Sequence, residues 1–406
     1  MKRIPIVNLA AIICSGLFAF VSIGLGQTWT ACTNAPNKEW WAVASSADGT
    51  KLVAAIYGGG IYTSTNSGLT WNSNSVPTKD WFSVASSADG TKLVAAINAS
   101  NGGIYSSTNS GATWTQTSAP GGLESWRSVS SSADGTKLVA AGGYFSSVIT
   151  HQLYTSSDSG NTWTMTSAPN LRWFSVACSA DGTHLVGLAS QTNVVFTSAD
   201  SGTTWTTNTL PVNYWNAVAS SADGTKLVAV AQGSGTLASG NGPIYSSTNT
   251  GVSWISNNVP LEYWNSIGSS SDGSKLVAAG VNTANNNGMI YTSSDYGHTW
   301  VSNNVPTYYW SSVASSADGS RLVAVAATGQ IYVATPTSPM LSIIASGSNF
   351  TVAWPSSATS FQLQKNSSLG TMTWTDVLDS VSITNGLNQV TVSRSNSEVF
   401  YRLKSQ

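Results

Sequence analysis

The sequence predicts an all-β fold, in which a seven-bladed β-propeller is followed by a small β-sandwich-like domain. A block of the approximate form Trp-x-Ser-Val-Ala-Ser-Ser-Ala-Asp-Gly recurs at a spacing of about 41 to 49 residues, which is the size of one four-stranded blade. After the first 26 residues no helical period of apolar residues is found. The blocks begin at Trp40, Trp81, Trp126, Trp173, Trp215, Trp264 and Trp310.

Two kinds of turn separate the short strands of each repeat. The Asp-Gly step inside the block favours a hairpin, because glycine readily takes the positive φ that the turn needs. A second motif, Ser-x-Asp/Asn-x-Gly-x-Thr/Ser-Trp, joins the third and fourth strands and begins at Ser64, Ser107, Ser156, Ser198, Ser247 and Ser293.

The seventh repeat lacks this second motif after Ile331, but the end of the motif stands near the beginning of the chain as Gly26-Gln27-Thr28-Trp29. We therefore expect the segment Thr28 to Thr33 to supply the fourth strand of the last blade. Such a strand closes the ring and removes an exposed sheet edge.

These motifs resemble those of the Asp-box, or bacterial neuraminidase repeat, propellers of the sialidase-like superfamily. That group includes sialidases, xyloglucanases, the sortilin ectodomain and the photosystem II assembly factor propeller. The resemblance covers about residues 27–335 and implies the fold, whereas the activity stays open because the group contains both enzymes and binding proteins.

The chain divides into four predicted segments. Residues 1–26 have the basic start, apolar run and small residues of a signal peptide, which predicts a bacterial protein that is secreted, periplasmic or held at the cell surface. The propeller follows at 27–335, then a Pro-Thr-Ser linker at 336–340 and a β-rich module at 341–406. The last module looks like the fibronectin-type or sorting modules that end many exported bacterial proteins.

Composition narrows the possible partners. Only 8% of the residues are charged and the net charge is -1. Nucleic acid is therefore not expected as a partner, because its binding requires a basic surface. No later apolar stretch is long enough for membrane insertion once the signal peptide is cleaved. No cofactor or metal is expected, since His151, His184 and His298 stand at unrelated positions. The mature chain is predicted to be a monomer.

Four carboxylates of the propeller lie outside the repeated turns, and a glycosidase needs a positioned pair. If the protein is a glycoside hydrolase or lyase, the candidates are therefore Glu39, Asp80, Glu124 and Glu262. The resemblance to sialidases implies three arginines that bind the substrate carboxylate. Arg127, Arg172 and Arg321 are the arginines of the propeller, and Arg321 stands in a structural slot, which argues against a sialidase.

Aromatic and basic residues around the repeated tryptophans form the candidate binding face. Aromatic faces near amide, carboxylate and guanidinium groups suit sugars, although a tryptophan that recurs with each blade also fits a wedge between blades. The predicted ligand contacts are the seven tryptophans that begin the blocks together with Tyr214, Tyr263, Tyr309, Arg127 and Arg172.

The leading hypothesis is a non-catalytic scaffold that recognises a glycan or an extracellular protein through this face. A glycoside hydrolase or lyase and a structural envelope protein are the alternatives.

Overall fold

The computed structural model describes residues 27–99, 102–121, 125–143, 151–189, 192–211, 214–232, 242–282, 287–327, 329–335, 341–346, 349–356, 361–367, 373–384, 387–393 and 399–405. The predicted signal peptide at 1–26 and the predicted linker at 336–340 lie outside these residues. Residues Gln27–Thr335 form one compact unit, and the described residues after 340 belong to a second one.

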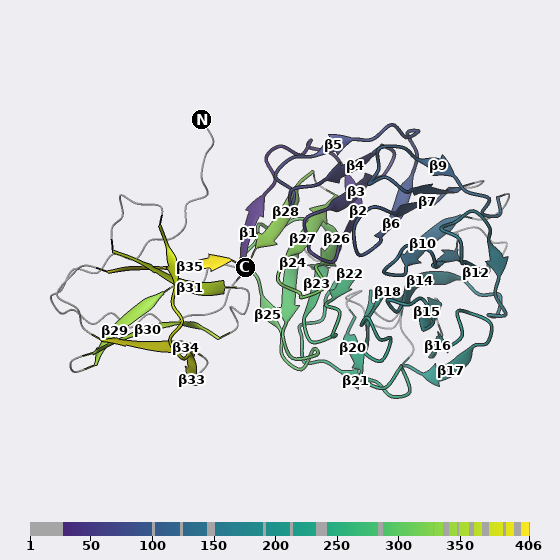
Figure 1. The fold of residues 1–406 in the computed structure, drawn as a ribbon. Coiled ribbons are helices and arrows are strands. Elements are labelled where there is room, and N and C mark those ends of the chain that lie inside the picture. The colour runs from purple at the N-terminus through teal and green to yellow at the C-terminus, as the bar shows by residue number, and fades with distance from the viewer. Residues whose placement is uncertain are drawn as a thin grey trace. The chain divides into compact units, whose positions relative to one another are not determined.

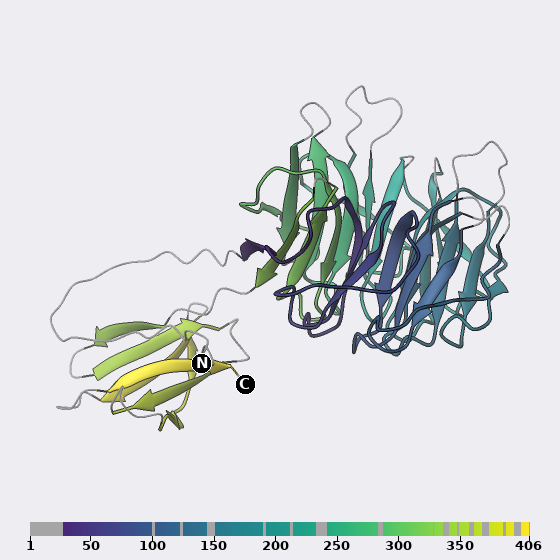
Figure 2. The same cartoon turned by 90° about the horizontal axis from the view of Figure 1, so that it is seen from above.

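The unit Gln27–Thr335 consists of seven four-stranded antiparallel sheets arranged in a ring (Figure 1). The prediction of an all-β propeller is confirmed. Figure 2 shows the strands of these sheets standing side by side around the ring. Within the described residues, no helix has the length and apolar character needed to cross a bilayer.

Each sheet runs from an inner strand, beside the ring centre, to an outer strand at the rim. The inner strands are β2 (Trp40–Ser45), β6 (Trp81–Ser86), β10 (Trp126–Ser131), β14 (Trp173–Cys178), β18 (Trp215–Ser220), β22 (Tyr263–Ser269) and β26 (Trp310–Ser315). The second strands are β3 (Leu52–Ile56), β7 (Leu93–Ile97), β11 (Leu138–Gly142), β15 (Leu185–Ala189), β19 (Leu227–Ala231), β23 (Leu276–Asn282) and β27 (Leu322–Ala326).

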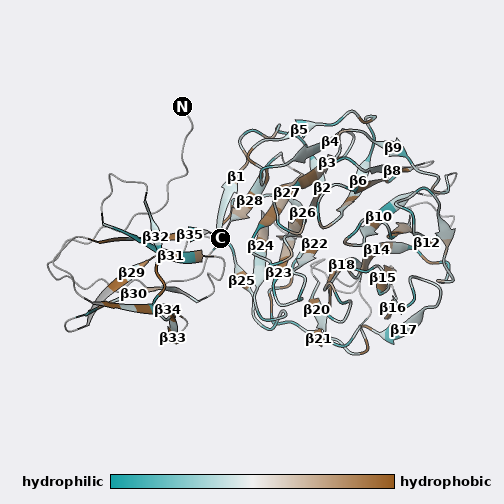
Figure 3. Ribbon diagram, in the orientation of Figure 1, coloured by the Kyte–Doolittle hydropathy of each residue, from teal (hydrophilic) through white to brown (hydrophobic). Residues whose placement is uncertain are grey.

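The third strands are β4 (Ile61–Ser64), β8 (Ile104–Ser107), β12 (Leu153–Ser156), β16 (Val194–Ser198), β20 (Ile244–Ser247), β24 (Asn287–Ser293) and β28 (Ile331–Thr335). Six of the outer strands are β5 (Asn72–Ser73), β9 (Thr115–Gln116), β13 (Thr164–Met165), β17 (Thr206–Thr209), β21 (Ile255–Ser256) and β25 (Val301–Ser302). The second strands are buried on both faces, as a continuous apolar run requires. Figure 3 accordingly shows β27 as hydrophobic and β17 as hydrophilic.

The outer strand of the last sheet comes from the start of the chain. Strand β1 (Thr28–Ala31) pairs antiparallel with β28, with Trp29 opposite Ala334. The predicted closure by the N-terminal segment is confirmed. The Trp29 indole nitrogen also donates to Asn303 Oδ1 at 3.2 Å, which ties this strand to the neighbouring blade.

Backbone hydrogen bonds join all seven blades at their Asp-Gly turns. The Ala47 N–H donates to the Ala88 carbonyl at 2.8 Å. Six equivalent bonds of 2.7 Å then continue around the ring through Ala133, Ala180, Ala222, Ser271 and Ala317 and return to Ala47. A closed circle of this kind ties each blade to the next one through paired backbone groups.

Serine hydroxyls join neighbouring inner strands at a second level. Ser128 Oγ accepts from the Val176 N–H at 3.1 Å, and four other junctions carry the same bond. Their acceptors are Ser83, Ser175, Ser266 and Ser312.

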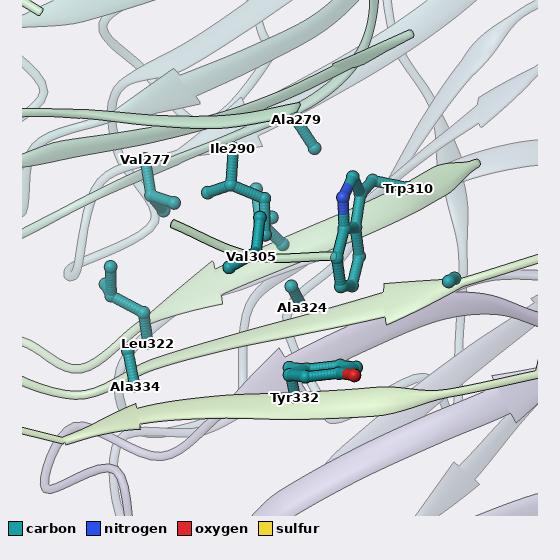
Figure 4. Close-up of a cluster of buried hydrophobic side chains, with 11 residues drawn as sticks. Val277, Ala279, Ile290, Val305, Trp310, Leu322, Ala324, Tyr332 and Ala334 are labelled. Carbon is teal, nitrogen blue, oxygen red and sulfur yellow. The ribbon is translucent and has the colours of Figure 1, made fainter. Parts of the chain in front are cut away.

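The repeated tryptophans fill the space between adjacent blades. Figure 4 shows Trp310 packed among Ala279 of β23, Ile290 of β24 and Tyr332 of β28. The Trp310 and Tyr332 rings meet edge to face, with centroids 5.5 Å apart. All seven tryptophans are 0% exposed, so each one is a core residue of a blade junction.

The second unit contains two sheets. One is four-stranded, in the order β29 (Ser342–Ser346), β30 (Asn349–Pro355), β34 (Leu387–Ser393) and β33 (Ser382–Thr384). The other consists of β32 (Thr375–Asp376), β31 (Phe361–Asn366) and β35 (Phe400–Ser405). Val352 and Val390 of the first sheet share a buried cluster with Leu363 and Tyr401 of the second, so the two sheets enclose one core.

Candidate functional site

Every inner strand contains a β-bulge directly after its tryptophan. In the first blade, Trp40 pairs with Ile56 and Ala42 with Ala55, so Trp41 is the extra residue. A bulge of this kind turns a side chain in a new direction. The bulge residues of the seven blades are Trp41, Phe82, Arg127, Phe174, Asn216, Asn265 and Ser311.

All seven bulge residues line one pocket of about 590 Å³ at the centre of the ring. Its volume is typical of a site for a small molecule or for part of a polymer. The lining extends from the Trp-bearing ends of the inner strands to about their fourth residue and does not include the Asp-Gly turns. Outside the inner strands the pocket is lined by Tyr57, Asp80, Asn98, Ala99, Gln232 and Tyr309, and Tyr263 begins β22.

One side of the pocket carries an unbroken row of aromatic and guanidinium groups, which we call the aromatic arc: Tyr57, Trp41, Phe82, Arg127 and Phe174. The Trp41 ring lies 5.4 Å from that of Tyr57 and 5.3 Å from that of Phe82, measured between centroids. The Arg127 guanidinium carbon lies 5.2 Å from the Phe82 centroid and 3.8 Å from the Phe174 centroid. Cation–π contacts at these distances hold the guanidinium against the rings.

Arg127 is buried, with 8% of its surface exposed. Burial lowers the pKa of Arg127 to about 10, and the nearby positive charge of Arg172 contributes to the decrease. The side chain therefore stays protonated at neutral pH. The guanidinium carbon of Arg172 lies 5.3 Å from the Phe174 centroid, so both guanidinium groups gather at the same end of the arc.

The opposite side of the pocket is polar, and its side chains brace the blades. Asn216 donates through Nδ2 to the carbonyls of Trp264 and Asn265, at 3.0 and 3.1 Å. Asn265 donates in the same way to the Trp310 carbonyl at 2.8 Å, and Ser311 Oγ donates to the Trp40 carbonyl at 2.7 Å. These bonds hold the amide planes and the hydroxyl in fixed orientations. We call Asn216, Asn265 and Ser311 the polar wall.

The structure places the predicted ligand contacts differently. Arg127, Tyr263 and Tyr309 line the pocket, and Arg172 lies beside Phe174 at its edge. The seven repeated tryptophans do not reach it, because their indoles are enclosed between blades. This burial argues against the expectation that they touch a ligand. Tyr214 is 37% exposed and lies outside the lining.

Three of the four predicted carboxylates belong to the described residues, and these three are not brought together. Asp80 lines the pocket, while Glu39 is exposed and lies outside the lining. Glu262 is buried, with Oε2 lacking a hydrogen-bond partner among the described residues, and burial raises its pKa. Glu124 lies outside the described residues. Asp80 is thus the only carboxylate among the described lining residues.

Sequence reasoning missed the polar wall and the lining residues Asn98 and Gln232. A signal was present, because the residue after each repeated tryptophan varies while its neighbours are nearly constant. That position carries Trp, Phe or Arg in the first four blades and Asn or Ser in the last three. The bulge that turns these side chains toward the pocket is not visible in the sequence.

Within the described ranges, no three His, Cys, Asp or Glu side chains come close enough to form a metal site.

Burial raises the pKa of the Tyr263 hydroxyl, and Tyr309 adds to the increase although Arg127 opposes it. Tyr263 is therefore neutral at physiological pH and its hydroxyl can donate a hydrogen bond.

Comparison with solved structures relates the fold to proteins of different activities. A GH74 xyloglucanase from Xanthomonas campestris aligns with a TM-score of 0.60 and 14% identity, over 81% of this chain and 59% of the xyloglucanase. This chain therefore spans about three fifths of that enzyme. YCF48 from Cyanidioschyzon merolae aligns with a TM-score of 0.57 and 13% identity, over 76% of this chain and 99% of YCF48.

A structure of YCF48 bound to D1 peptide aligns with a TM-score of 0.55 and 15% identity, over 78% of this chain and 99% of that protein. At these identities the likeness establishes the propeller fold alone. No curated protein sequence matches the chain. A family model described as the DUF6242 beta propeller domain matches residues 123–351.

Proposed function

This chain belongs to the DUF6242 β-propeller domain family, and we propose that its propeller is a non-catalytic recognition scaffold that binds a glycan in the central pocket. The pocket itself carries the proposal. Its lining includes the variable residue that follows the tryptophan in every repeat, and its two sides differ in chemistry.

The two sides suit the two kinds of surface on a sugar ring. The aromatic arc offers apolar faces to ring C–H groups. The polar wall, together with Asn98, Gln232 and the tyrosine hydroxyls, offers hydrogen-bonding groups to sugar hydroxyls. Fixed orientation of these groups reduces the entropy that binding would otherwise lose.

Hydrolysis receives less support from the same pocket. Glycosidases usually place two carboxyl groups about 5 to 10 Å apart across the scissile bond. Asp80 is the single carboxylate among the described lining residues, and Glu39 lies outside the lining. A structural envelope protein without a ligand would leave the variable lining without a role.

The proposal includes export of the protein to the cell surface or beyond, in keeping with the predicted signal peptide. We also propose that this propeller shares its ancestry with the Asp-box propellers of the sialidase-like superfamily. Six Ser-x-Asp/Asn-x-Gly motifs support this relationship.

A glycan array and polysaccharide pull-downs test the proposal. The parent is compared with a Tyr263→Ala/Tyr309→Ala variant, which changes two lining residues, and with Tyr214→Ala, a matched control outside the lining. We expect the double variant to lose binding while it stays folded and the control to retain it. Binding of a protein or peptide in place of any glycan would refute the glycan proposal. Sugar release from the polymer would refute the non-catalytic role.

A further inference from the structure

We propose that the central pocket selects glycans that contain a hexuronic acid, and that Arg127 is the residue that binds the carboxylate. This inference rests on the proposed glycan-binding function and adds the chemical class of the ligand.

The position of Arg127 suits this role. It is the bulge residue of β10, so its side chain is turned toward the pocket by the same backbone irregularity that places Trp41 and Phe174 there. The ring of Phe174 stacks 3.8 Å from the guanidinium carbon. Guanidinium donors lie in the plane of the group, so stacking on a ring leaves their directions unchanged. That fork matches the two oxygens of a carboxylate.

The local charge also favours an anion. Arg127 and Arg172 both contact the Phe174 ring, and the positive charge of Arg172 acts on Arg127. Both positive charges attract a carboxylate that binds at this end of the aromatic arc. Asp80, the single carboxylate among the described lining residues, belongs to the neighbouring blade, just before β6.

The polar wall gives the ligand a direction. Asn216 donates through Nδ2 to two backbone carbonyls of the next blade and Asn265 to one, so each side chain can present its amide oxygen to a ligand. Amide oxygens accept hydrogen bonds from sugar hydroxyls and repel carboxylates. A uronic acid would therefore place its carboxylate toward Arg127 and its hydroxyls toward the polar wall, with its apolar face near Trp41.

Calorimetric titration of the full chain tests this inference with three probes. They are a trigalacturonate, the same trisaccharide with its carboxyl groups reduced to alcohols, and a short peptide with a free C-terminal carboxylate. We expect the acidic trisaccharide to bind at least about tenfold more tightly than the reduced one, a difference of about 1.4 kcal/mol. The preference should shrink at high salt.

Variants then identify the residue responsible. Arg127→Lys keeps the charge but removes the fork, so it should lose most of the preference for the acidic sugar while binding of the reduced sugar persists. Arg172→Gln should weaken the preference without removing it, and it supplies a second test if Arg127→Lys does not fold. The control is Lys38→Gln, which removes an exposed cation outside the lining.

The outcomes separate the two proposals. Equal binding of both trisaccharides by the parent would overturn the uronate inference and leave glycan binding in place. Binding of the peptide alone, or of none of the probes together with a negative glycan array, would overturn both. An acidic preference that Arg127→Lys leaves unchanged would show that another group holds the carboxylate and would overturn the role of Arg127.

Discussion

Two adjacent tryptophans in β2 are expected to respond to mutation in opposite ways. Trp40 is 0% exposed and packs edge to face on Tyr62, with centroids 5.3 Å apart, and against Trp71 at 6.1 Å. Trp41 is the bulge residue and lines the pocket. One strand thus presents one indole to the core and the next to the site.

The magnitudes follow from these surroundings. Truncation of a fully buried aromatic residue costs about 3 to 5 kcal/mol, because the apolar contacts are lost and a cavity remains. We therefore expect Trp40→Ala to lower the free energy of unfolding by that amount. Trp41→Ala loses two ring contacts, each of about 0.5 to 1.5 kcal/mol, so its cost should be about 1 to 3 kcal/mol.

Binding should show the reverse order. Trp41→Ala removes a surface that the ligand would contact, so we expect at least about a tenfold weaker affinity. Trp40→Ala should bind normally in the fraction that is folded. Equilibrium unfolding in urea and calorimetric titration with the best glycan from the array measure the two effects. The reasoning is refuted if Trp41→Ala destabilises the protein as much as Trp40→Ala and leaves affinity unchanged.

Three further predictions concern stability. Hydrogen bonds from Ser87 and Ser132 lower the pKa values of Asp89 and Asp134 from 3.8 to about 2. Each carboxylate therefore contributes at most about 1 kcal/mol to the free energy of unfolding after solvent screening. This contribution is present above pH 3.8 and should be lost as the pH falls through about 2. Urea unfolding at several pH values measures this loss, which should be smaller in Asp134→Asn than in the parent. An equally steep loss in the variant would contradict the prediction. Burial raises the pKa of Glu262 above its usual 4.5. The carboxylate becomes charged as the pH rises above this value, and the buried charge then lowers the stability of the folded protein. Glu262→Gln should therefore stabilise the protein at pH 7 by on the order of 1 kcal/mol but not at pH 4. A gain of the same size at both pH values would exclude ionisation as its cause. Ser128→Ala should cost about 1 to 3 kcal/mol in urea unfolding, because the Val176 N–H loses its acceptor. Unchanged stability would contradict this prediction.

The repeat made the architecture predictable from the sequence. Each blade needs the same inner-strand tryptophan, the same Asp-Gly turn and the same second strand, so seven copies repeat one local solution. The displaced Gly-x-Thr-Trp ending also indicated that the start of the chain pairs with β28, as it does. Local turn chemistry and strand periodicity are properties of short segments, and the sequence therefore carries them directly.

The candidate site was predictable only in part. The sequence indicated Arg127, Asp80, Tyr263 and Tyr309, which do line the pocket. It could not separate Trp40 from Trp41, because exposure depends on which side of the strand faces the neighbouring blade and on a bulge that shifts the register by one residue.

Only the tertiary structure decided which residues meet. Phe82, Arg127 and Phe174 are about 45 residues apart in sequence, and closure of the ring brings their side chains into contact. Glu39 and Asp80 occupy equivalent positions, yet only Asp80 reaches the pocket. The sequence by itself thus determined the blade and its repetition, since these depend on local interactions. The asymmetry of the pocket depends on contacts between blades, which exist only once the ring has closed.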